Sequence, residues 1–146
     1  VRREDIPEKT FPGGALRVLA GNYGETAGYQ SEHLPLDYYD IRLEKNAEFR
    51  LETPPERAVM LFTLLGEAEI AGKTVPEKTA VRLTEGNFVT LRSGESPACV
   101  LCMSSRALNE PVCWGGPIVM NTREELDRAF QELRAGSFLK DEVNYK

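Results

Sequence analysis

Residues 117–130 read "PIVMNTREELDRAF", and this stretch carries the clearest helix signal in the sequence. Thr122 and Glu125 are spaced as a capping box, in which the threonine hydroxyl accepts the amide hydrogen of Glu125 and the glutamate carboxylate accepts that of Thr122. Apolar residues then recur at helical spacing: Leu126, Ala129, Phe130 and Leu133. Gly136 is expected to end the helix in the left-handed conformation. The stretch therefore predicts one amphipathic helix, with an apolar face that packs on a barrel formed by the upstream strands.

Upstream of this helix the sequence consists of short apolar stretches separated by glycine, proline or asparagine. They cover residues 15–21, 36–44, 47–52, 58–72, 80–86, 87–94 and 98–105. Several of them alternate apolar and polar residues, which indicates strands, and strands at this spacing favour an all-β sandwich or barrel. Residues 59–65 are apolar at nearly every position, so we expect a strand in the middle of a sheet that is buried on both faces.

Composition points to a soluble globular protein. The chain has 146 residues, of which 41% are hydrophobic and 28% charged, which is typical of one domain. The 23 acidic and 18 basic residues give a net charge of -5, and the basic residues are scattered, so direct binding to nucleic acid is not expected.

Targeting signals are also missing from the sequence. No apolar run approaches the roughly 20 residues of a membrane span, and the first residues, "VRREDIPEKTF", do not read as a signal peptide. We therefore expect no membrane association and a cytoplasmic location. Because the sequence begins with Val1 rather than methionine, we also expect that the numbering can start inside a longer chain.

The helix signal belongs to a longer stretch that resembles a known family. Residues 111–138, "PVCWGGPIVMNTREELDRAFQELRAGSF", are similar to the closing segment of the pirin family, in which a tryptophan, a Gly and Pro turn and an "MNTREE" helix start end the second of two cupin barrels. Three upstream segments agree with this resemblance: "RVLAGNYG" (17–24), "YYDIRLEKNAEF" (38–49) and "MLFTLLGEAEIAG" (60–72).

The resemblance implies a fold and a domain organisation. The expected fold is all-β, a cupin (RmlC-like jelly-roll) β-barrel with one C-terminal α-helix. The pirin C-terminal cupin domain is expected to cover residues 14–139, between a loose N-terminal segment, 1–13, and a tail, 140–146. A complete pirin-like protein has an N-terminal cupin before this one, so the expected partners are that domain or a second copy in a homodimer, besides a possible protein partner.

The resemblance also bears on metal chemistry. In the pirin family the N-terminal barrel binds iron or another divalent metal through three histidines and a glutamate. It is associated with quercetin 2,3-dioxygenase activity and with a role as a transcriptional cofactor. This chain has one histidine, and "LETPPERAVMLF" (51–62) contains none where catalytic cupins have a pair. We therefore expect no catalytic residue and no cofactor in this chain, with His33 as a weak metal candidate that more simply reads as an exposed loop histidine.

Three cysteines are present, two of them in a C-x-x-C at Cys99 and Cys102. That motif suggests zinc or redox chemistry in other settings. Residues three apart in a strand point to opposite faces, so the two thiols would not chelate one ion without a bulge. Adding Cys113 and His33 matches no usual zinc spacing, so we expect three reduced and largely buried thiols.

The remaining candidates are carboxylates and aromatic residues. Glu67 and Glu69 could form an acid and base pair, but alternate positions on a strand more simply make its solvated face. Trp114 could be a binding anchor, and packing between barrel and helix is the favoured interpretation. Tyr38 and Tyr39 point to opposite faces, so at most one lines the barrel. Tyr39 and Trp114 are thus the candidates for a pocket or an interface.

Three functions remain open from the sequence. The first is a metal-free C-terminal cupin domain that acts as a structural, regulatory or protein-interaction module. The second is part of a full-length pirin-like quercetin 2,3-dioxygenase whose metal lies in an N-terminal cupin. The third is small-molecule binding in the barrel. Because fold does not imply function, the family's activity is not assigned to this chain.

Overall fold

The computed structural model describes residues 2–84 and 86–140. The chain divides into two compact units, the first ending at Ala107 and the second beginning at Leu108. Each unit has its own hydrophobic core. The sequence, which has no linker signal inside residues 14–139, does not predict this division. The expected tail lies outside the described residues beyond Lys140. In the part of the chain that the structure describes, no helix combines the length and the apolar character that crossing a membrane requires.

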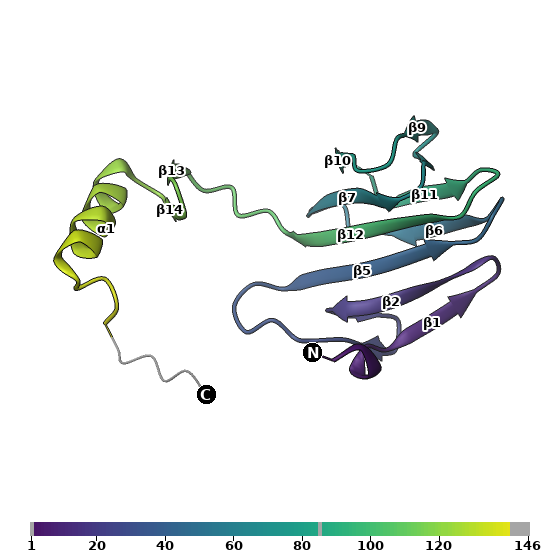
Figure 1. Ribbon diagram of the computed structural model, residues 1–146, viewed down its shortest axis with the longest axis horizontal. Helices are drawn as coiled ribbons and strands as arrows, with labels where there is room; N and C mark the ends of the chain where they lie inside the picture. Colours follow the sequence, from purple (N-terminus) through teal and green to yellow (C-terminus); the bar gives the residue numbers. More distant parts are fainter. Residues whose placement is uncertain (1, 85, 141–146) are drawn as a thin grey trace. The chain divides into compact units, whose positions relative to one another are not determined.

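The first unit contains two antiparallel sheets that face each other (Figure 1). The larger sheet has the strand order β1-β2-β5-β12-β7-β10. Its strands are β1 (Glu8–Phe11), β2 (Gly14–Ala20), β5 (Leu36–Leu43), β12 (Ala98–Arg106), β7 (Arg57–Leu65) and β10 (Ala80–Arg82). The smaller sheet has the order β6-β11-β8-β9. Its strands are β6 (Glu48–Glu52), β11 (Phe88–Ser93), β8 (Ala68–Ile70) and β9 (Lys73–Val75).

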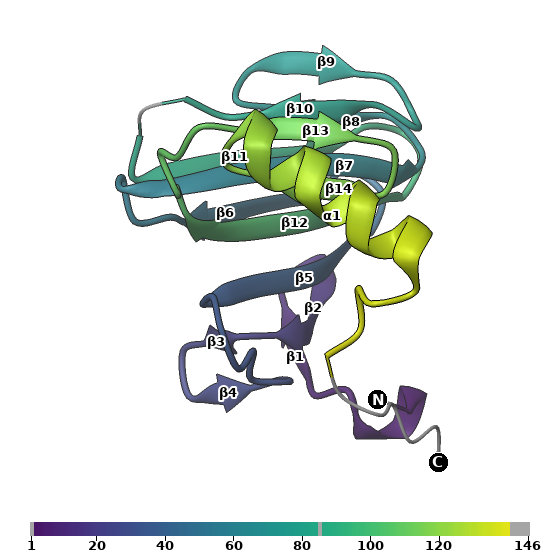
Figure 2. The same cartoon turned by 90° about the vertical axis from the view of Figure 1, so that its left-hand side faces the viewer.

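Shorter elements complete this unit. Strands β3 (Asn22–Tyr23) and β4 (Thr26–Ala27) form a small separate hairpin (Figure 2), and η1 (Arg3–Asp5) is a single 3₁₀ turn. Gly66 ends β7 with a φ of 71°, a conformation that glycine adopts without a steric penalty. Its amide donates a hydrogen bond to the Glu77 carboxylate at 2.8 Å. This turn is the glycine break expected from the sequence.

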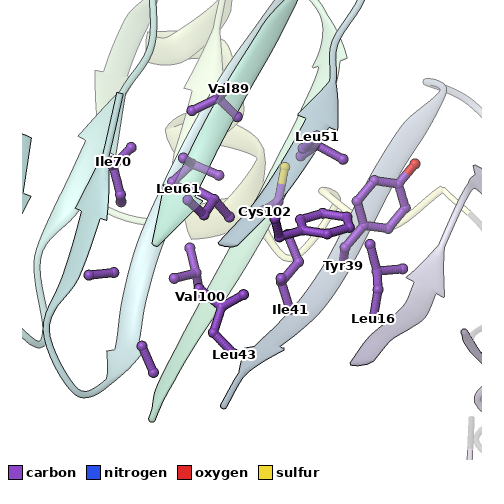
Figure 3. Packing of buried hydrophobic residues seen from close by; sticks show 14 of the residues in the cluster. Leu16, Tyr39, Ile41, Leu43, Leu51, Leu61, Ile70, Val89, Val100 and Cys102 are labelled. Atoms are coloured by element: carbon purple, nitrogen blue, oxygen red, sulfur yellow. The ribbon is translucent and has the colours of Figure 1, made fainter. Parts of the chain in front are cut away.

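The core lies between the two sheets (Figure 3). Leu61 and Val100 come from the larger sheet, while Leu51, Val89 and Ile70 come from the smaller one. On several strands the buried residues alternate with more exposed ones, as in β6, where Phe49 and Leu51 are buried between exposed neighbours. On β5 and β12 short runs of three successive residues are buried as well. The alternation that predicted strands in the sequence is therefore the alternation between the core side and the outer side of each sheet.

Strand β7 differs from the expectation that both of its faces are buried. It lies inside the sheet, between β12 and β10, as predicted. Val59, Leu61 and Thr63 are buried on its core side, but Met60 is 44% exposed on its outer side. An apolar side chain on the outer side of a sheet is buried only if another layer covers it. Among the described residues of this unit, no such layer covers Met60.

The N-terminal segment is more ordered than expected. Strand β1 forms the edge of the larger sheet and pairs with β2 from Glu8↔Arg17 to Phe11↔Gly14. The ring of Phe11 contacts that of Phe49, with centroids 4.3 Å apart. The sequence gives no strand signal here because an edge strand with both faces largely exposed does not need alternating apolar residues.

The second unit is a hairpin and a helix. Strands β13 (Cys113–Gly115) and β14 (Ile118–Met120) pair, and α1 (Arg123–Ala135) packs on them (Figure 2). Gly115 lies under the helix, where an added Cβ would stand 3.0 Å from the ring of Phe130. The predicted helix is thus present, with its apolar face against this hairpin.

The ends of α1 are those predicted from the sequence. Both hydrogen bonds of the Thr122 and Glu125 capping box form. Gly136 closes the helix in the left-handed conformation, with a φ of 71°. Within the apolar stripe Leu126 and Ala129 are buried, but Leu133 is 45% exposed. The stripe is therefore covered over its first two turns and open in the last.

Candidate functional site

The stretch where catalytic cupins have their histidine pair leads into the start of β7. Thr53 is buried, and its amide donates to the Asn87 carbonyl at 2.9 Å. Arg57 opens β7 and forms an ion pair with Asp37, the second residue of β5. The other carboxylate oxygen of Asp37 accepts the amide hydrogen of Asn22 at 3.3 Å. The charges of Asp37 and Arg57 therefore satisfy each other. Ser104 on β12, which pairs with Asp37 on β5, is buried beside them, and its hydroxyl has no hydrogen-bond partner among the described residues.

A small pocket opens beside these residues. Its volume is about 130 Å³. Its lining includes Thr53, Arg57, Val59, Leu83, Phe88 and Val89. Drug-sized ligands and cofactors usually occupy clefts of roughly 300 to 1,000 Å³. The pocket therefore has room for a few atoms only.

The barrel interior consists of packed apolar side chains (Figure 3). Leu51, Leu61 and Val89 fill it from both sheets, together with Val100 and the thiol of Cys102. Across residues 2–84 and 86–140, no three His, Cys, Asp or Glu side chains lie close enough to hold a metal ion. Apolar side chains donate no lone pairs, so this interior does not fit a divalent metal.

His33 lies exposed in the loop between β4 and β5. From the sequence, His33 was a weak candidate for a metal ligand, with an exposed loop histidine as the simpler interpretation. Its position matches the simpler interpretation. A catalytic imidazole would have to face the reacting group from a fixed position. An exposed loop position provides no such geometry.

The three cysteines are free thiols. Cys102 faces the core, whereas Cys99 points to the outer side of β12 and donates to an Asp40 carboxylate oxygen at 3.1 Å. Burial is the main cause that raises the pKa of each thiol to about 12, helped by Asp40 for Cys99 and by Asp37 for Cys102. The two thiols of the C-x-x-C thus lie on opposite faces, as predicted, and both are protonated at neutral pH. Cys113, in the second unit, is only half-buried.

Tyr39 lies in the core rather than in a pocket. It is 6% exposed, its ring meets that of Tyr23 edge to face at 5.8 Å, and its hydroxyl donates to the Asn22 carbonyl. Burial and the nearby Asp37 raise the pKa of Tyr39. Tyr38 lies on the opposite face of β5, so one tyrosine of the pair lines the interior, as expected. Tyr39 is therefore a packing residue that ties β5 to the β3–β4 hairpin.

Within the second unit, Trp114 does not lie on the side of the hairpin that packs against α1. Its side chain is 73% exposed, and its indole Nε1 donates to the Gly116 carbonyl at 2.6 Å. Alternation along β13 is the cause, because Cys113 and Gly115 face the helix and leave Trp114 on the other side with Val119, its cross-strand partner. The alternative interpretation, a binding anchor, is compatible with this position.

The outer side of the smaller sheet is charged, as expected for Glu67 and Glu69. Glu67 is exposed, and Glu69 forms an ion pair with Arg92 at 2.7 Å. Arg92 also pairs with Glu48 at 2.6 Å. The carboxylates are thus part of a solvated surface rather than an acid and base pair.

Sequence analysis missed one polar cluster on the outer side of the larger sheet. Asp40 is 7% exposed, pairs with Arg42 at 2.9 Å and Arg17 at 3.5 Å, and accepts the Cys99 thiol hydrogen. Asp40 and Arg42 are two residues apart on one strand, a spacing from which their ion pair could have been predicted. Arg17 and Cys99 lie on neighbouring strands and join them only through strand pairing. The charges in this cluster are already matched.

Two facing antiparallel sheets around an apolar interior, with the strand order given above, define the first unit as a cupin jelly-roll β-barrel. The family model described as the pirin C-terminal cupin domain matches residues 38–139. The chain therefore belongs to the pirin family and corresponds to its C-terminal cupin domain.

Relatives of known name agree with this assignment. A pirin-like protein of Caulobacter vibrioides is 35% identical and matches 92% of this chain and 50% of its own length. Pirin of Mus musculus is 30% identical over 92% of this chain and 48% of its own length. The crystal structure of a quercetin 2,3-dioxygenase from Acinetobacter baumannii superposes with a TM-score of 0.85 at 30% identity, over 94% of this chain and 49% of that one. The chain thus spans about half the length of the relatives it matches.

Proposed function

We propose that this chain is a non-catalytic cupin module that works by associating with another protein domain. The observation that carries the proposal is the barrel interior, which apolar side chains of both sheets fill where catalytic cupins gather metal ligands. The single histidine of the chain lies outside the barrel, in an exposed loop. A module of this kind stabilises or regulates the domain it contacts.

The electrostatics of the barrel opening support the same proposal. Asp37 and Arg57 neutralise each other, and the adjoining pocket of about 130 Å³ is small for a substrate. Perturbed ionisable groups aimed into a cleft are the usual mark of an active site. Here the strongly shifted groups, the Cys102 thiol and the Tyr39 hydroxyl, are part of the packed core, and the Cys99 thiol is paired with Asp40 on the outer side of the sheet.

The test is elemental analysis of the purified chain by plasma mass spectrometry after brief dialysis, with a quercetin turnover assay on the same sample. We expect metal well below one equivalent and no turnover above the buffer rate. Metal near one equivalent together with turnover would overturn the proposal and show that His33, the thiols or the carboxylates form a site.

A second candidate function follows from the length of the relatives. A quercetin 2,3-dioxygenase from Acinetobacter baumannii, which is about twice as long, matches this chain over 49% of its length. In this alternative the chain is one half of a metal-dependent dioxygenase whose metal lies in an N-terminal cupin. A reading frame that continues upstream of Val1 into a cupin with a His-x-His motif supports it, and an initiator codon directly before Val1 contradicts it.

Cellular location is part of the proposal. We place the module in the cytoplasm, and the support is its three free cysteines, since thiols persist in reducing compartments. Binding to nucleic acid is not part of the proposed role, because the net charge is -5.

A further inference from the structure

Polar side chains close one end of the barrel on the core side of the larger sheet. Strand pairing sets Asp37 of β5, Ser104 of β12 and Val59 of β7 side by side in one row. The next row inward has Cys102 at its centre, fully buried among the side chains of the core (Figure 3). The barrel therefore changes from polar to apolar within one row, directly beneath Ser104.

The ion pair between Arg57 and Asp37 crosses this end of the barrel. The two residues belong to β7 and β5, which are not neighbours, because β12 lies between them. Adjacent strands are about 4.8 Å apart, so the two side chains together bridge roughly 10 Å of sheet. Arg57 starts one row further out than Asp37, opposite Arg106, and its guanidinium therefore passes over β12 beside Ser104. We call this ion pair the Arg57–Asp37 strap.

The Ser104 hydroxyl lies behind the Arg57–Asp37 strap without a partner. Ser104 is buried, its oxygen is not accessible to water, and it makes no hydrogen bond with any of the described residues. A buried hydroxyl without a partner costs free energy, because the same group would bond to water if it were exposed. Movement of the Arg57 side chain alone, without any change in strand pairing, would give this hydroxyl access to water.

Two contributions to stability oppose each other at this end of the barrel. Asp37 and Arg57 are both partly exposed, and ion pairs that water reaches contribute little net stability. The penalty for the unpartnered Ser104 hydroxyl is of similar size and acts against the closed arrangement. Closing the strap therefore gains little free energy, and opening it costs little.

The two halves of the strap are held differently. The second carboxylate oxygen of Asp37 accepts the Asn22 amide hydrogen at 3.3 Å. Gly21 lies against the same oxygen, where an added Cβ would stand only 2.1 Å away. The Arg57 guanidinium bonds to Asp37 and to no other of the described residues. Asp37 is thus fixed by the neighbouring loop, and Arg57 is the half that moves.

We infer that the Arg57–Asp37 strap is a gate, in which the Arg57 side chain swings away from Asp37 and opens this end of the barrel while both sheets stay folded. In the open state water and small reagents reach Ser104 and then Cys102 beneath it. The adjoining pocket of about 130 Å³, which Arg57 and Val59 line, then extends toward the interior. The inference goes beyond the proposed function, because it concerns access to the barrel rather than association.

The test is alkylation of the native chain with iodoacetamide, followed by tandem mass spectrometry that locates the label at each cysteine. Cys102 lies behind the strap, whereas Cys99 lies on the outer side of the same strand. Global unfolding exposes both thiols, but opening of the gate exposes Cys102 alone, so the ratio of the two rates reports the gate. Arg57→Gln removes the charge that holds the strap closed. We expect it to raise the ratio of Cys102 to Cys99 labelling about fivefold, as for loss of a partly exposed ion pair.

Two further variants sharpen the test. Arg92→Gln is the matched control, since it removes an arginine with two ion pairs from the outer side of the smaller sheet, and it should leave the ratio unchanged. Ser104→Ala removes the unpartnered hydroxyl that favours opening, so we expect Cys102 to be labelled about threefold more slowly. A purely structural role of these residues does not predict opposite effects of Arg57→Gln and Ser104→Ala.

The remaining outcomes each have one meaning. A ratio that Arg57→Gln leaves unchanged overturns the inference, and so does a rise that Arg92→Gln reproduces. Far-UV circular dichroism checks that each variant folds. If Arg57→Gln does not fold, Ser104→Ala decides the question, because slower labelling of Cys102 supports the gate and an unchanged or faster rate contradicts it. Labelling is measured apart from metal content and turnover, so its failure is distinguishable from failure of the proposed function.

Discussion

The outer sides of the two sheets belong to the same barrel and share one core, yet they differ in chemistry. On β11 the outward residues Phe88, Thr90 and Arg92 lie among ion pairs, whereas on β12 the outward residues Leu101 and Met103 lie among other apolar side chains. The core imposes the same alternation on both sheets and does not explain the difference. The comparison therefore separates the residues that folding requires from those that folding leaves free to differ.

The largest effect is expected from neighbouring residues on the two sides of β7. Leu61 is fully buried and Met60 is 44% exposed. Leu61→Ala leaves a cavity between the sheets and should lower the free energy of unfolding by about 2 to 5 kcal/mol. Met60→Ala removes a side chain that water already reaches, so we expect less than about 1 kcal/mol.

Urea denaturation measures both variants. Equal losses of stability for Met60→Ala and Leu61→Ala would break the comparison, because they would mean that both sides of β7 are buried within a single chain.

A smaller effect is expected from alkaline pH. Burial raises the pKa of Cys102 from its ordinary 9.0 to about 12. Between these two values the unfolded chain loses a proton that the folded chain keeps, so the free energy of unfolding falls as pH rises through this window. Cys99, on the outer side under Asp40, behaves with the same sign.

The measurement is denaturation at several pH values between about 8 and 10, where the contribution of each thiol appears as a slope. Cys102→Ala lacks one such proton, so its stability should fall less steeply with pH than that of the unchanged chain. A slope identical to that of the unchanged chain would mean that the thiol is not protected by burial.

The smallest effect is expected on the solvated side. Arg92→Ala removes two exposed ion pairs, with Glu48 and Glu69, which water and salt already screen. We expect a change in stability within the error of a denaturation curve. A loss of stability above about 1 kcal/mol would show that these ion pairs are screened less than their exposure suggests.

Local signals made part of this fold predictable from sequence. Thr122, Glu125 and Gly136 specify the ends of α1 through bonds within one turn, so the helix could be read directly. The alternation in β6 and the break at Gly66 are equally local. The family resemblance, carried by the same C-terminal stretch, then supplied the cupin fold.

The remaining features depend on pairing between distant residues. Tyr38, Met103 and Met60 become one row only after β5, β12 and β7 are aligned, and no window of sequence contains all three. The apolar run at 59–65 suggested burial on both faces, since hydrophobicity alone does not reveal which side a neighbour covers. The side of the hairpin that Trp114 takes likewise depends on where the helix packs, which the residues around it do not reveal.

The edges of the two sheets carry a consequence of their own. Strand β10 has three residues, β9 has three, and β6 alternates its buried positions with Glu48, Arg50 and Glu52. Short or charged edges recruit added strands poorly, which guards against the edge-to-edge stacking that leads to fibrils. The edges of the two sheets thus lower the risk of this kind of aggregation whatever the faces of the sheets contact.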